Sequence, residues 1–440
     1  MSKLRLRSKH LLWVMLIAAL LVRMAVILIA FQSAETFSGD GPFYLSAARY
    51  LDRLWFPADT QQAITSIGPL YPLFLSPLVH LIPKSAEVAQ LVSVRLAQAG
   101  VDTLTVLLVY VLARHLFGER AGRIALVAQA FDPRYLFTNG AIATETLFIA
   151  LFIGSLLAYL WADEAKQMGR YALSGVLLGL AVLTRPIPLL FPLVLLAHTL
   201  IKPQGRRQAL RGWAALMVAM AVVVTPWMVR TALLSGKLIP VSDTAFVHFW
   251  RASREDGDVI TSDIAIKEAA EEDNLDRSAK AEGLVDPYVA AGLRNVLEKP
   301  LPWLERTVER TVASYLQPYG TVILTPRGAG VRQKVQAFLA GEASLGEVLA
   351  VPGLWRRLLM YIWHYWGLIG GAAGLALILR QRWRELLPLW GWVVYLTGVT
   401  APLLIEPRYV FPAMFALTIL AAHATSWAWD ALRVRRRGTQ

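Results

Sequence analysis

Residues 11–31 read LLWVMLIAALLVRMAVILIAF, a stretch in which only Arg23 is charged. A helix needs about 20 mostly apolar residues to cross the hydrocarbon core of a bilayer, so this stretch predicts a membrane-spanning helix. Four basic residues precede it, as in a secretory signal peptide. However, the run is longer than the apolar region of a signal peptide, and no A-x-A cleavage site follows it. We therefore expect a retained membrane helix.

Nine further apolar stretches follow the first one. They cover residues 91–112, 124–137, 141–161, 171–183, 187–201, 212–229, 358–379, 386–405 and 409–427. Hydrophobic residues make up 56% of the 440 residues and charged residues 17%, against roughly 25% charged in a soluble domain. The sequence therefore predicts an all-α polytopic membrane protein with about ten transmembrane helices.

Basic residues are unevenly distributed between the connections. With the N-terminus inside and the spans alternating, the inside segments carry 20 of the 44 lysine and arginine residues. The short outside connections carry one each, namely Arg134, Arg185 and Arg408. Cytoplasmic loops are enriched in Lys and Arg, so we expect both termini in the cytoplasm. The same rule favours two short helices that meet at Arg185-Pro186, because one kinked helix would place the basic residues 202–211 outside.

This topology divides the chain into three parts with two long outer segments. They are an N-terminal membrane part (1–229) with a first outer loop (32–90), a large outer, periplasmic loop region (230–357), and a C-terminal membrane part with a basic cytoplasmic tail (358–440).

The large outer loop region is the most acidic part of the chain, with 17 of the 31 acidic residues. Residues 263–282 predict a charged, solvated helix. Residues 301–320 place Leu304, Val308, Val312 and Tyr315 on one stripe and charged residues elsewhere. This pattern is typical of a helix that lies along a membrane surface.

Several chemistries are disfavoured. The chain has no cysteine, which excludes disulfides, thiolate metal sites and a thiol nucleophile. Its seven histidines lack metal-ligand spacing, and no phosphate-binding glycine loop or dinucleotide fingerprint occurs. The net charge of +13 is explained by the inside clusters at the membrane, so we expect no nucleic acid partner.

Carboxylates and arginines gather at the predicted outer ends of the spans. They are Asp40, Asp132, Glu145, Arg185, Glu406 and Arg408. Ionisable groups at membrane depth are costly, so they indicate a functional site by default. Arginine is the planar, permanent cation that pairs with phosphate. This set suggests a phosphorylated ligand and a proton-accepting base.

Structural alternatives stay open for each of these residues. Asp40 lies in a turn-like stretch, Ser-Gly-Asp-Gly-Pro (38–42), and Glu145 suits the first turn of a helix. Asp132, before Pro133, is expected to be a helix-end or turn residue. The two arginines have Glu145 and Glu406 as alternative structural partners. Inside the spans, interhelical packing bonds are expected for Arg95 and Asp102, and Arg23 is expected to snorkel or to pair.

Taken in order, short motifs resemble bacterial glycosyltransferases of the GT-C superfamily, in particular the protein O-mannosyltransferase and aminoarabinose transferase relatives (glycosyltransferase family 39 type). The motifs are GDGPFY (39–44), GPLYPL (68–73), ARHLFG (113–118), TETLF (144–148), GLAVLTRP (179–186), PWMVR (226–230) and RY (408–409). The resemblance covers residues 1–240 and 360–430. One departure is that Ser66-Ile67 precede the second motif, where the aminoarabinose branch has a lysine.

The resemblance implies an enzyme of the bacterial inner (plasma) membrane that moves a sugar from a polyprenyl-phosphate donor to an outer-face acceptor, with inversion. It implies Asp40 as the catalytic carboxylate, Glu145 as a second acidic residue and Arg185 as a ligand of the donor phosphate. Arg408 is a further candidate for the phosphate. The acceptor is a lipid, a glycan or a protein. Use of a divalent metal varies across the superfamily, so a metal stays open here.

The chemistry of the residues fits this role independently. A hydroxyl is a weak nucleophile, and a carboxylate such as Asp40 can accept its proton. The leaving phosphate needs fixed cations. The alternatives are a polytopic transporter or lipid flippase, for which buried charges at the midplane are expected, and a surface-polysaccharide polymerase or ligase.

Overall fold

The computed structural model describes residues 2–36, 39–55, 66–201, 205–235, 239, 241–258, 260, 263–273, 275, 286–321 and 330–437. These residues form helices and no strands. The α-helices are α1 (Ser2–Ala30), α2 (Gly41–Arg49), α3 (Leu51–Trp55), α4 (Leu70–Leu81), α5 (Glu87–Ala130), α6 (Pro133–Thr138), α7 (Glu145–Ala165), α8 (Met168–Thr184), α9 (Pro192–Ile201), α10 (Arg206–Ser235), α11 (Thr244–Ser253), α12 (Asp263–Glu272), α13 (Pro287–Glu298), α14 (Pro300–Leu316), α15 (Val331–Leu339), α16 (Leu345–Leu349), α17 (Leu354–Gln381), α18 (Leu387–Thr400), α19 (Pro407–Val410) and α20 (Met414–Arg437). Three short 3₁₀ helices accompany them: η2 (Lys84–Ala86), η3 (Ile187–Leu190) and η4 (Phe411–Ala413).

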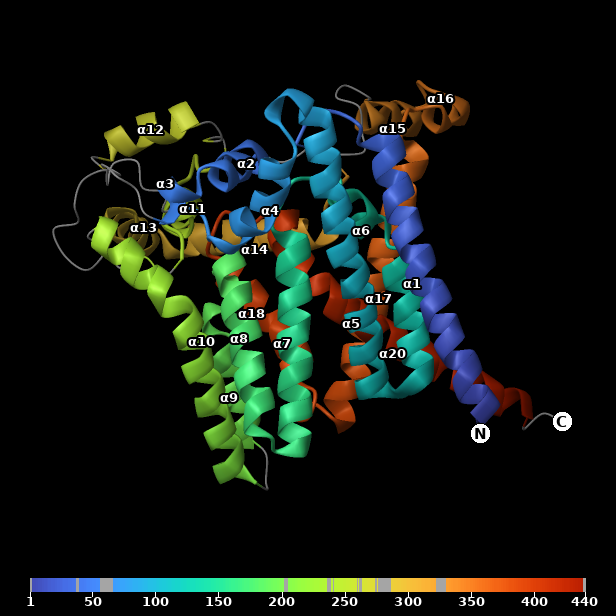
Figure 1. Ribbon diagram of the computed structural model, residues 1–440. Helices are drawn as coiled ribbons and strands as arrows, with labels where there is room; N and C mark the ends of the chain where they lie inside the picture. The colour runs from blue at the N-terminus through green and yellow to red at the C-terminus, as the bar shows by residue number, and fades with distance from the viewer. Residues whose placement is uncertain are drawn as a thin grey trace.

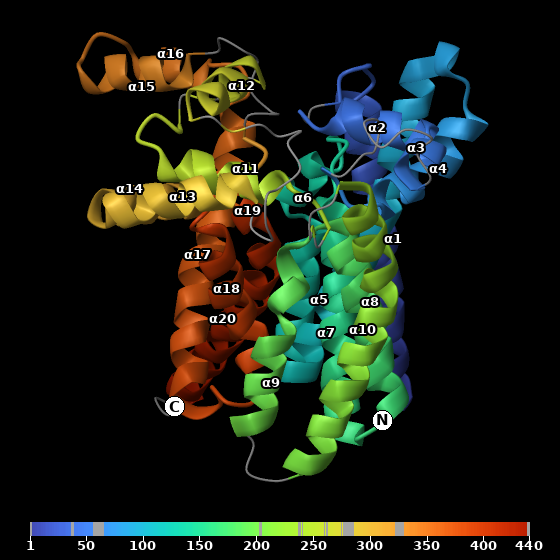
Figure 2. The same ribbon diagram turned by 90° about the vertical axis from the view of Figure 1, so that its left-hand side faces the viewer.

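The long apolar helices run side by side as one bundle (Figures 1 and 2). Within the described residues, six helical segments are long and apolar enough to cross a membrane, and they contain α1, α5, α7, α10, α17 and α20. Four shorter apolar helical segments, of 10–17 residues, are Leu70–Leu81, Met168–Thr184, Ile187–Ile201 and Leu387–Thr400. The predicted class, an all-α polytopic membrane protein, is confirmed.

The turns between spans follow the predicted pattern in two places. α8 ends at Thr184, and η3 separates it from α9, as predicted for a break at Arg185-Pro186. α5 holds two predicted spans, and its backbone leaves the helical conformation at Gly118, where φ is 85°. A positive φ carries little steric cost in glycine, which explains the residue at this bend.

Some helix ends differ from the predictions. The expected span over 124–137 is interrupted, because α5 ends at Ala130 and Asp132 caps the separate helix α6 by accepting from the backbone N–H of Arg134 at 2.9 Å. Pro133 favours a helix start, since proline lacks the N–H that a first turn leaves unused. α18 ends at Thr400 and is shorter than expected, whereas α7 begins at Glu145 and is shifted along the sequence without being shorter.

The remaining helices gather at one end of the bundle, which we call the outer end. It carries α2, α3, α4, α6 and α11–α16, and the two chain termini lie at the opposite end (Figures 1 and 2). This arrangement agrees with a chain that crosses an even number of times. Of the charged helix expected over 263–282, the described residues form α12 (Asp263–Glu272), and the helix ends before Asp273. Ser38, residues 56–65 of the first outer loop and residues 276–282 lie outside the described residues.

The buried ionisable side chains inside the bundle bind other parts of the protein, as expected. The Arg23 guanidinium donates to the Asp102 carboxylate at 2.7 Å, and both side chains are almost fully buried. Arg95 donates to the backbone carbonyls of Ser33 (3.0 Å) and Gly140 (2.9 Å). A buried charge is stabilised only when it is paired and hydrogen-bonded. Arg95 therefore fixes the segment that leads from α1 toward Asp40.

An aromatic cluster joins α7, α18 and the end of η3 beneath the outer end. The ring centroids of Phe152 and Trp392 are 3.8 Å apart, and Phe191 meets Trp392 edge-on at 5.4 Å. The three side chains are almost fully buried. Aromatic side chains contribute large buried areas, so this cluster holds α7, α18 and the end of η3 together.

Gly68 lets the first outer loop approach α8 closely. A Cβ at this position would lie 2.2 Å from the carbonyl oxygen of Leu183. Gly68→Ala should therefore destabilise the protein by about 1–3 kcal/mol, the usual cost of overpacking. Thermal unfolding in detergent, followed by circular dichroism, measures the loss.

Gly100→Ala is the matched control, because a Cβ at Gly100 of α5 meets no atom within 4 Å. We expect it to leave the melting temperature unchanged or higher, since alanine favours a helix. Equal melting temperatures for the Gly68→Ala variant and the wild type would contradict the close approach.

Candidate active site at the outer end of the bundle

The site begins at Glu145, the first residue of α7. Its carboxylate is fully buried and lies at the N-terminal end of the helix. The dipole of a helix stabilises a negative charge at this end by about 0.3–1 kcal/mol. This is much less than the cost of burying a carboxylate, so Glu145 also needs cationic partners.

Two arginines supply these partners. Arg185 follows the last residue of α8, and its Nη1 lies 2.6 Å from Oε1 of Glu145. Arg408 of α19 donates from Nε to the same oxygen. The Nη1 atom of Arg408 also donates to Oδ2 of Asp40 at 2.6 Å. All four residues proposed from the sequence therefore lie in one chain of ion pairs, in the order Asp40, Arg408, Glu145 and Arg185.

The two carboxylates differ in access. The Glu145 side chain is 0% exposed, whereas that of Asp40 is 50% exposed. Asp40 precedes α2 and stays within reach of a ligand, while Glu145 is covered by the arginines. The two carboxylates and two guanidinium groups together carry no net charge, so the chain of ion pairs by itself holds no excess charge for an anion.

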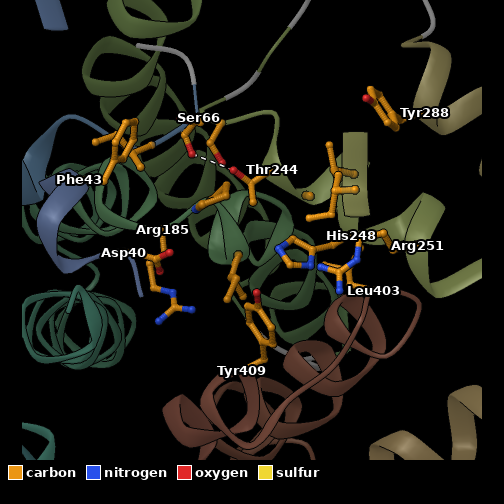
Figure 3. A pocket seen from close by; sticks show the side chains of 18 of the residues that line it. Asp40, Phe43, Ser66, Arg185, Thr244, His248, Arg251, Tyr288, Leu403 and Tyr409 are labelled. Carbon is orange, nitrogen blue, oxygen red and sulfur yellow. Dashed lines mark hydrogen bonds between the residues drawn. The ribbon is translucent and has the colours of Figure 1, made fainter. Parts of the chain in front are cut away.

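A cavity of about 1250 Å³ opens beside this chain of ion pairs. Its lining includes Asp40, Arg185, Arg408 and Tyr409 on one side, and residues of α11, α12 and α13 on the other. Figure 3 shows Asp40 and Arg185 close together, with His248 and Arg251 across the cavity beyond Tyr409. Pockets for drug-sized ligands measure about 300–1,000 Å³, so this cavity can hold a larger ligand.

Arg251 of α11 is a second cationic feature of the cavity. It is 7% exposed, and its buried Nε has no hydrogen-bond partner. Among the described residues, no ion pair links its guanidinium to a carboxylate at 4.0 Å or less. The pKa of Arg251 is lowered overall, because burial lowers it by more than the Glu406 carboxylate raises it. Arginine stays charged in proteins, so Arg251 adds one unit of positive charge to the cavity.

Sequence reasoning did not single out His248 or Arg251. Their spacing of three residues places them on one face of a helix, and this was the only signal in the sequence. Nothing in the sequence indicated that this face lines a cavity with Asp40. His248 also packs edge-on against Tyr409, with ring centroids 6.0 Å apart.

Tyr44, which is buried, and Tyr319, which is partly buried, lie near the chain of ion pairs. Burial raises the pKa of Tyr44 to about 12, and the nearby arginines lower it by less. Burial also raises the pKa of Tyr319, and the Glu145 carboxylate raises it further. Both phenols therefore stay protonated at neutral pH.

The carboxylates do not fit a resident divalent metal. Within the described ranges, no group of three His, Cys, Asp or Glu side chains lies close enough to hold an ion. Arg408 joins Asp40 to Glu145, so a cation of the protein already occupies the place between them. We therefore assign no chemical step to a metal.

Part of the chain resembles a known protein family in sequence. The family described as dolichyl-phosphate-mannose-protein mannosyltransferase matches residues 68–229. This range contains Glu145 and Arg185 and ends before α11. No curated protein matches the chain.

Solved structures share the architecture over nearly the whole chain. The archaeal oligosaccharyltransferase AglB from Archaeoglobus fulgidus, solved with an inhibitory peptide and a dolichol-phosphate, is 17% identical and covers 98% of this chain with a TM-score of 0.55. The oligosaccharyltransferase of the same organism, tethered to an acceptor peptide, is 18% identical and covers 97% with a TM-score of 0.55. The chain spans about half of each of these proteins, 51%. The match with ArnT from Cupriavidus metallidurans, in the apo state, covers 95% of this chain and 78% of ArnT. The two are 14% identical, with a TM-score of 0.41.

The chain thus shares the fold of these oligosaccharyltransferase structures, and residues 68–229 match the mannosyltransferase family. The resemblance expected from the sequence is confirmed. The roles of Asp40, Glu145, Arg185 and Arg408 stay predictions.

Burial predicts different stability effects for the two carboxylates. Glu145→Gln leaves two arginines without their shared buried anion, and breaking a buried pair costs about 3–5 kcal/mol. Asp40→Asn affects a half-exposed pair, which is worth about 0–1 kcal/mol. We expect a clearly lower melting temperature for Glu145→Gln and a near-native one for Asp40→Asn. Thermal unfolding of both variants under one detergent condition tests this, and equal melting temperatures would contradict the proposed difference in burial.

Proposed function

We propose that the chain is an integral membrane glycosyltransferase that moves a sugar from a polyprenyl-phosphate donor to an acceptor hydroxyl at the outer face of the membrane. The observation that carries the proposal is the cavity at the outer end. It combines a half-exposed carboxylate, Asp40, with a buried cation, Arg251, that has no carboxylate partner. The GT-C fold supports the same reaction class.

Asp40 acts as the general base in this proposal. It accepts the proton of the acceptor hydroxyl while the hydroxyl oxygen attacks the anomeric carbon of the sugar. The bond from that carbon to the phosphate oxygen breaks, and polyprenyl phosphate leaves with the bonding electrons. One displacement inverts the anomeric centre and needs no covalent enzyme intermediate. A positioned base of this kind contributes about 10²–10⁴-fold to the rate.

The arginines divide two tasks between them. Arg408 binds Asp40 and Glu145, and Arg185 binds Glu145, so both orient the carboxylates. They also line the cavity and stay candidates for the donor phosphate. Arg251 adds the positive charge that this chain of ion pairs lacks, and we assign it the donor phosphate. Fixed cations stabilise a leaving phosphate most strongly in a site that excludes water.

The donor lipid has an apolar route to the cavity. Ile187 of η3 lines the cavity, while Leu190 and Leu193 expose about half of their surface on the bundle. A polyprenyl tail would lie along this side, with its phosphate inside. A bilayer-embedded donor explains why the site lies at the end of a membrane bundle. The sugar, the length of the carrier and the acceptor are left open by these contacts.

Asp40→Asn should abolish donor turnover without loss of fold. The test incubates purified protein in nanodiscs with labelled polyprenyl-phosphate mannose, glucose, arabinose or aminoarabinose, together with acceptor-containing membranes, and measures the polyprenyl phosphate released. We expect release from one donor by the wild type, and at least a 100-fold slower release by Asp40→Asn.

Full release by the variant would remove Asp40 as the base. If no donor is turned over by the wild type, the transfer proposal fails and transport of a lipid-linked sugar becomes the better explanation. Analysis of the product separates a single transfer from the growth of a surface polysaccharide.

Arg251→Gln should weaken the donor interaction. The lost charge-assisted contact is worth about 1.5–3 kcal/mol, which corresponds to roughly a 10- to 150-fold loss in kcat/KM for the donor. Arg251→Lys should retain part of the activity, because it keeps the charge but loses the planar fork. Kinetics of polyprenyl phosphate release against donor concentration measure both effects.

Arg294→Gln is the matched control, since Arg294 lies exposed on α13 and does not line the cavity. It should behave as the wild type does. If Arg251→Gln and Arg294→Gln both retain wild-type kcat/KM, the donor phosphate is not bound by Arg251.

A further inference from the structure

α14 has a stripe of exposed apolar side chains along its whole length. The side chains of this stripe are 49–75% exposed and belong to Leu301, Leu304, Val308, Val312 and Leu316. Their spacing of three or four residues places them on one face. Two exposed leucines of α13, Leu293 and Leu297, precede the stripe. A contiguous exposed apolar surface marks a site that contacts another protein or a membrane.

The opposite face of α14 binds the protein. Arg310 donates from Nη1 to the carbonyl of Ala252 at 3.0 Å and pairs with Asp258 at 2.9 Å. Ser314 is buried and donates to the carbonyl of Ile405 at 3.2 Å. These bonds fix the rotation of the helix, so the stripe must face away from α11.

Tyr315 shows the direction in which the stripe faces. It follows Leu304, Val308 and Val312 along the helix at a spacing that places it at the edge of the stripe. Its hydroxyl is 2.7 Å from the hydroxyl of Thr397, one turn inside the outer end of α18. The stripe therefore faces the side on which the membrane-spanning helices lie.

The depth of α14 is fixed by α17. Tyr365 of α17 donates to the carbonyl of Leu316 at 3.0 Å. From this residue to the end of α17 at Gln381, a rise of 1.5 Å per residue gives about 24 Å. The hydrocarbon core of a bilayer is about 30 Å thick. α14 thus lies close to the outer boundary of the hydrocarbon, and Figure 2 shows it crossing the upper ends of the bundle and extending past α17.

We propose that the apolar face of α13 and α14 lies on the outer membrane surface, with lipid acyl chains as its occupant. The face continues the lipid-facing surface of α17, on which Ile362 and Ile369 are 66% and 70% exposed. An amphipathic helix in this position buries its apolar side at the boundary between headgroups and acyl chains. This membrane contact is independent of the chemistry proposed for the cavity.

The contact links the membrane surface to the walls of the cavity. Through Arg310, α14 binds the carbonyl of Ala252, the residue after Arg251. Through Ser314, it binds the carbonyl of Ile405, three residues before Arg408. A bilayer that holds α14 in place therefore also holds the backbone beside both cations.

Spin labels can test the depth directly, because the chain has no cysteine of its own. One label is attached at Val308→Cys, in the centre of the stripe, and another at Ala313→Cys. Ala313 is exposed on another face of the same helix, so both substitutions leave buried contacts intact. In nanodiscs, power-saturation spectroscopy compares collisions with oxygen, which concentrates in hydrocarbon, against collisions with a water-soluble nickel chelate.

We expect the label at Val308 to be several-fold more accessible to oxygen than to the chelate, and the label at Ala313 to show the reverse. Equal chelate access at both positions would overturn the proposal. Dipolar broadening at Val308 that disappears on dilution with unlabelled protein would also overturn it, because it would show that a second copy covers the stripe. A melting temperature equal to that of the wild type establishes that each labelled protein is folded.

Discussion

The organisation of the outer end depends on one buried carboxylate, Glu145. A carboxylate without exposed surface is tolerated only with cationic partners, and two arginines from separate helical segments bind the same oxygen atom. This requirement brings the end of α8 and the start of α19 to the start of α7. Arg408 then extends the network to Asp40, before α2. Residues about 370 positions apart in the sequence thereby define one site.

The packing of the bundle sets the positions of these groups. Phe152, Phe191 and Trp392 hold α7, η3 and α18 together beneath the site, and the absence of a side chain at Gly68 lets the first outer loop reach Leu183. Arg95 holds the segment between α1 and α2 by binding backbone carbonyls. Charges placed in this way stay oriented before a ligand arrives, which is the condition for effective electrostatic stabilisation.

Much of this arrangement could be predicted from local sequence, and some of it could not. Apolar length predicts the spans, and the uneven distribution of basic residues predicts that Asp40, Glu145, Arg185 and Arg408 share one end. Glu145 was among the partners considered for the arginines, and it binds Arg185. The partners of Arg408 were harder to predict, because Glu406 lies two residues before it, yet Arg408 binds Asp40 and Glu145. Arg251 was missed because its role depends on where α11 packs over the bundle, a long-range contact without a local signature.

The division of charge explains why the site needs a cation from outside its motifs. Every positive charge in the chain of ion pairs is matched by a carboxylate, and this balance keeps Glu145 buried at acceptable cost. Under the proposed function, a phosphate that displaced Arg408 from Asp40 would leave this carboxylate without its partner. A separate arginine on α11 avoids this conflict, because it can bind an anion without breaking an existing pair. The same helix is fixed by α14, so the position of this cation depends on the membrane surface that α14 contacts.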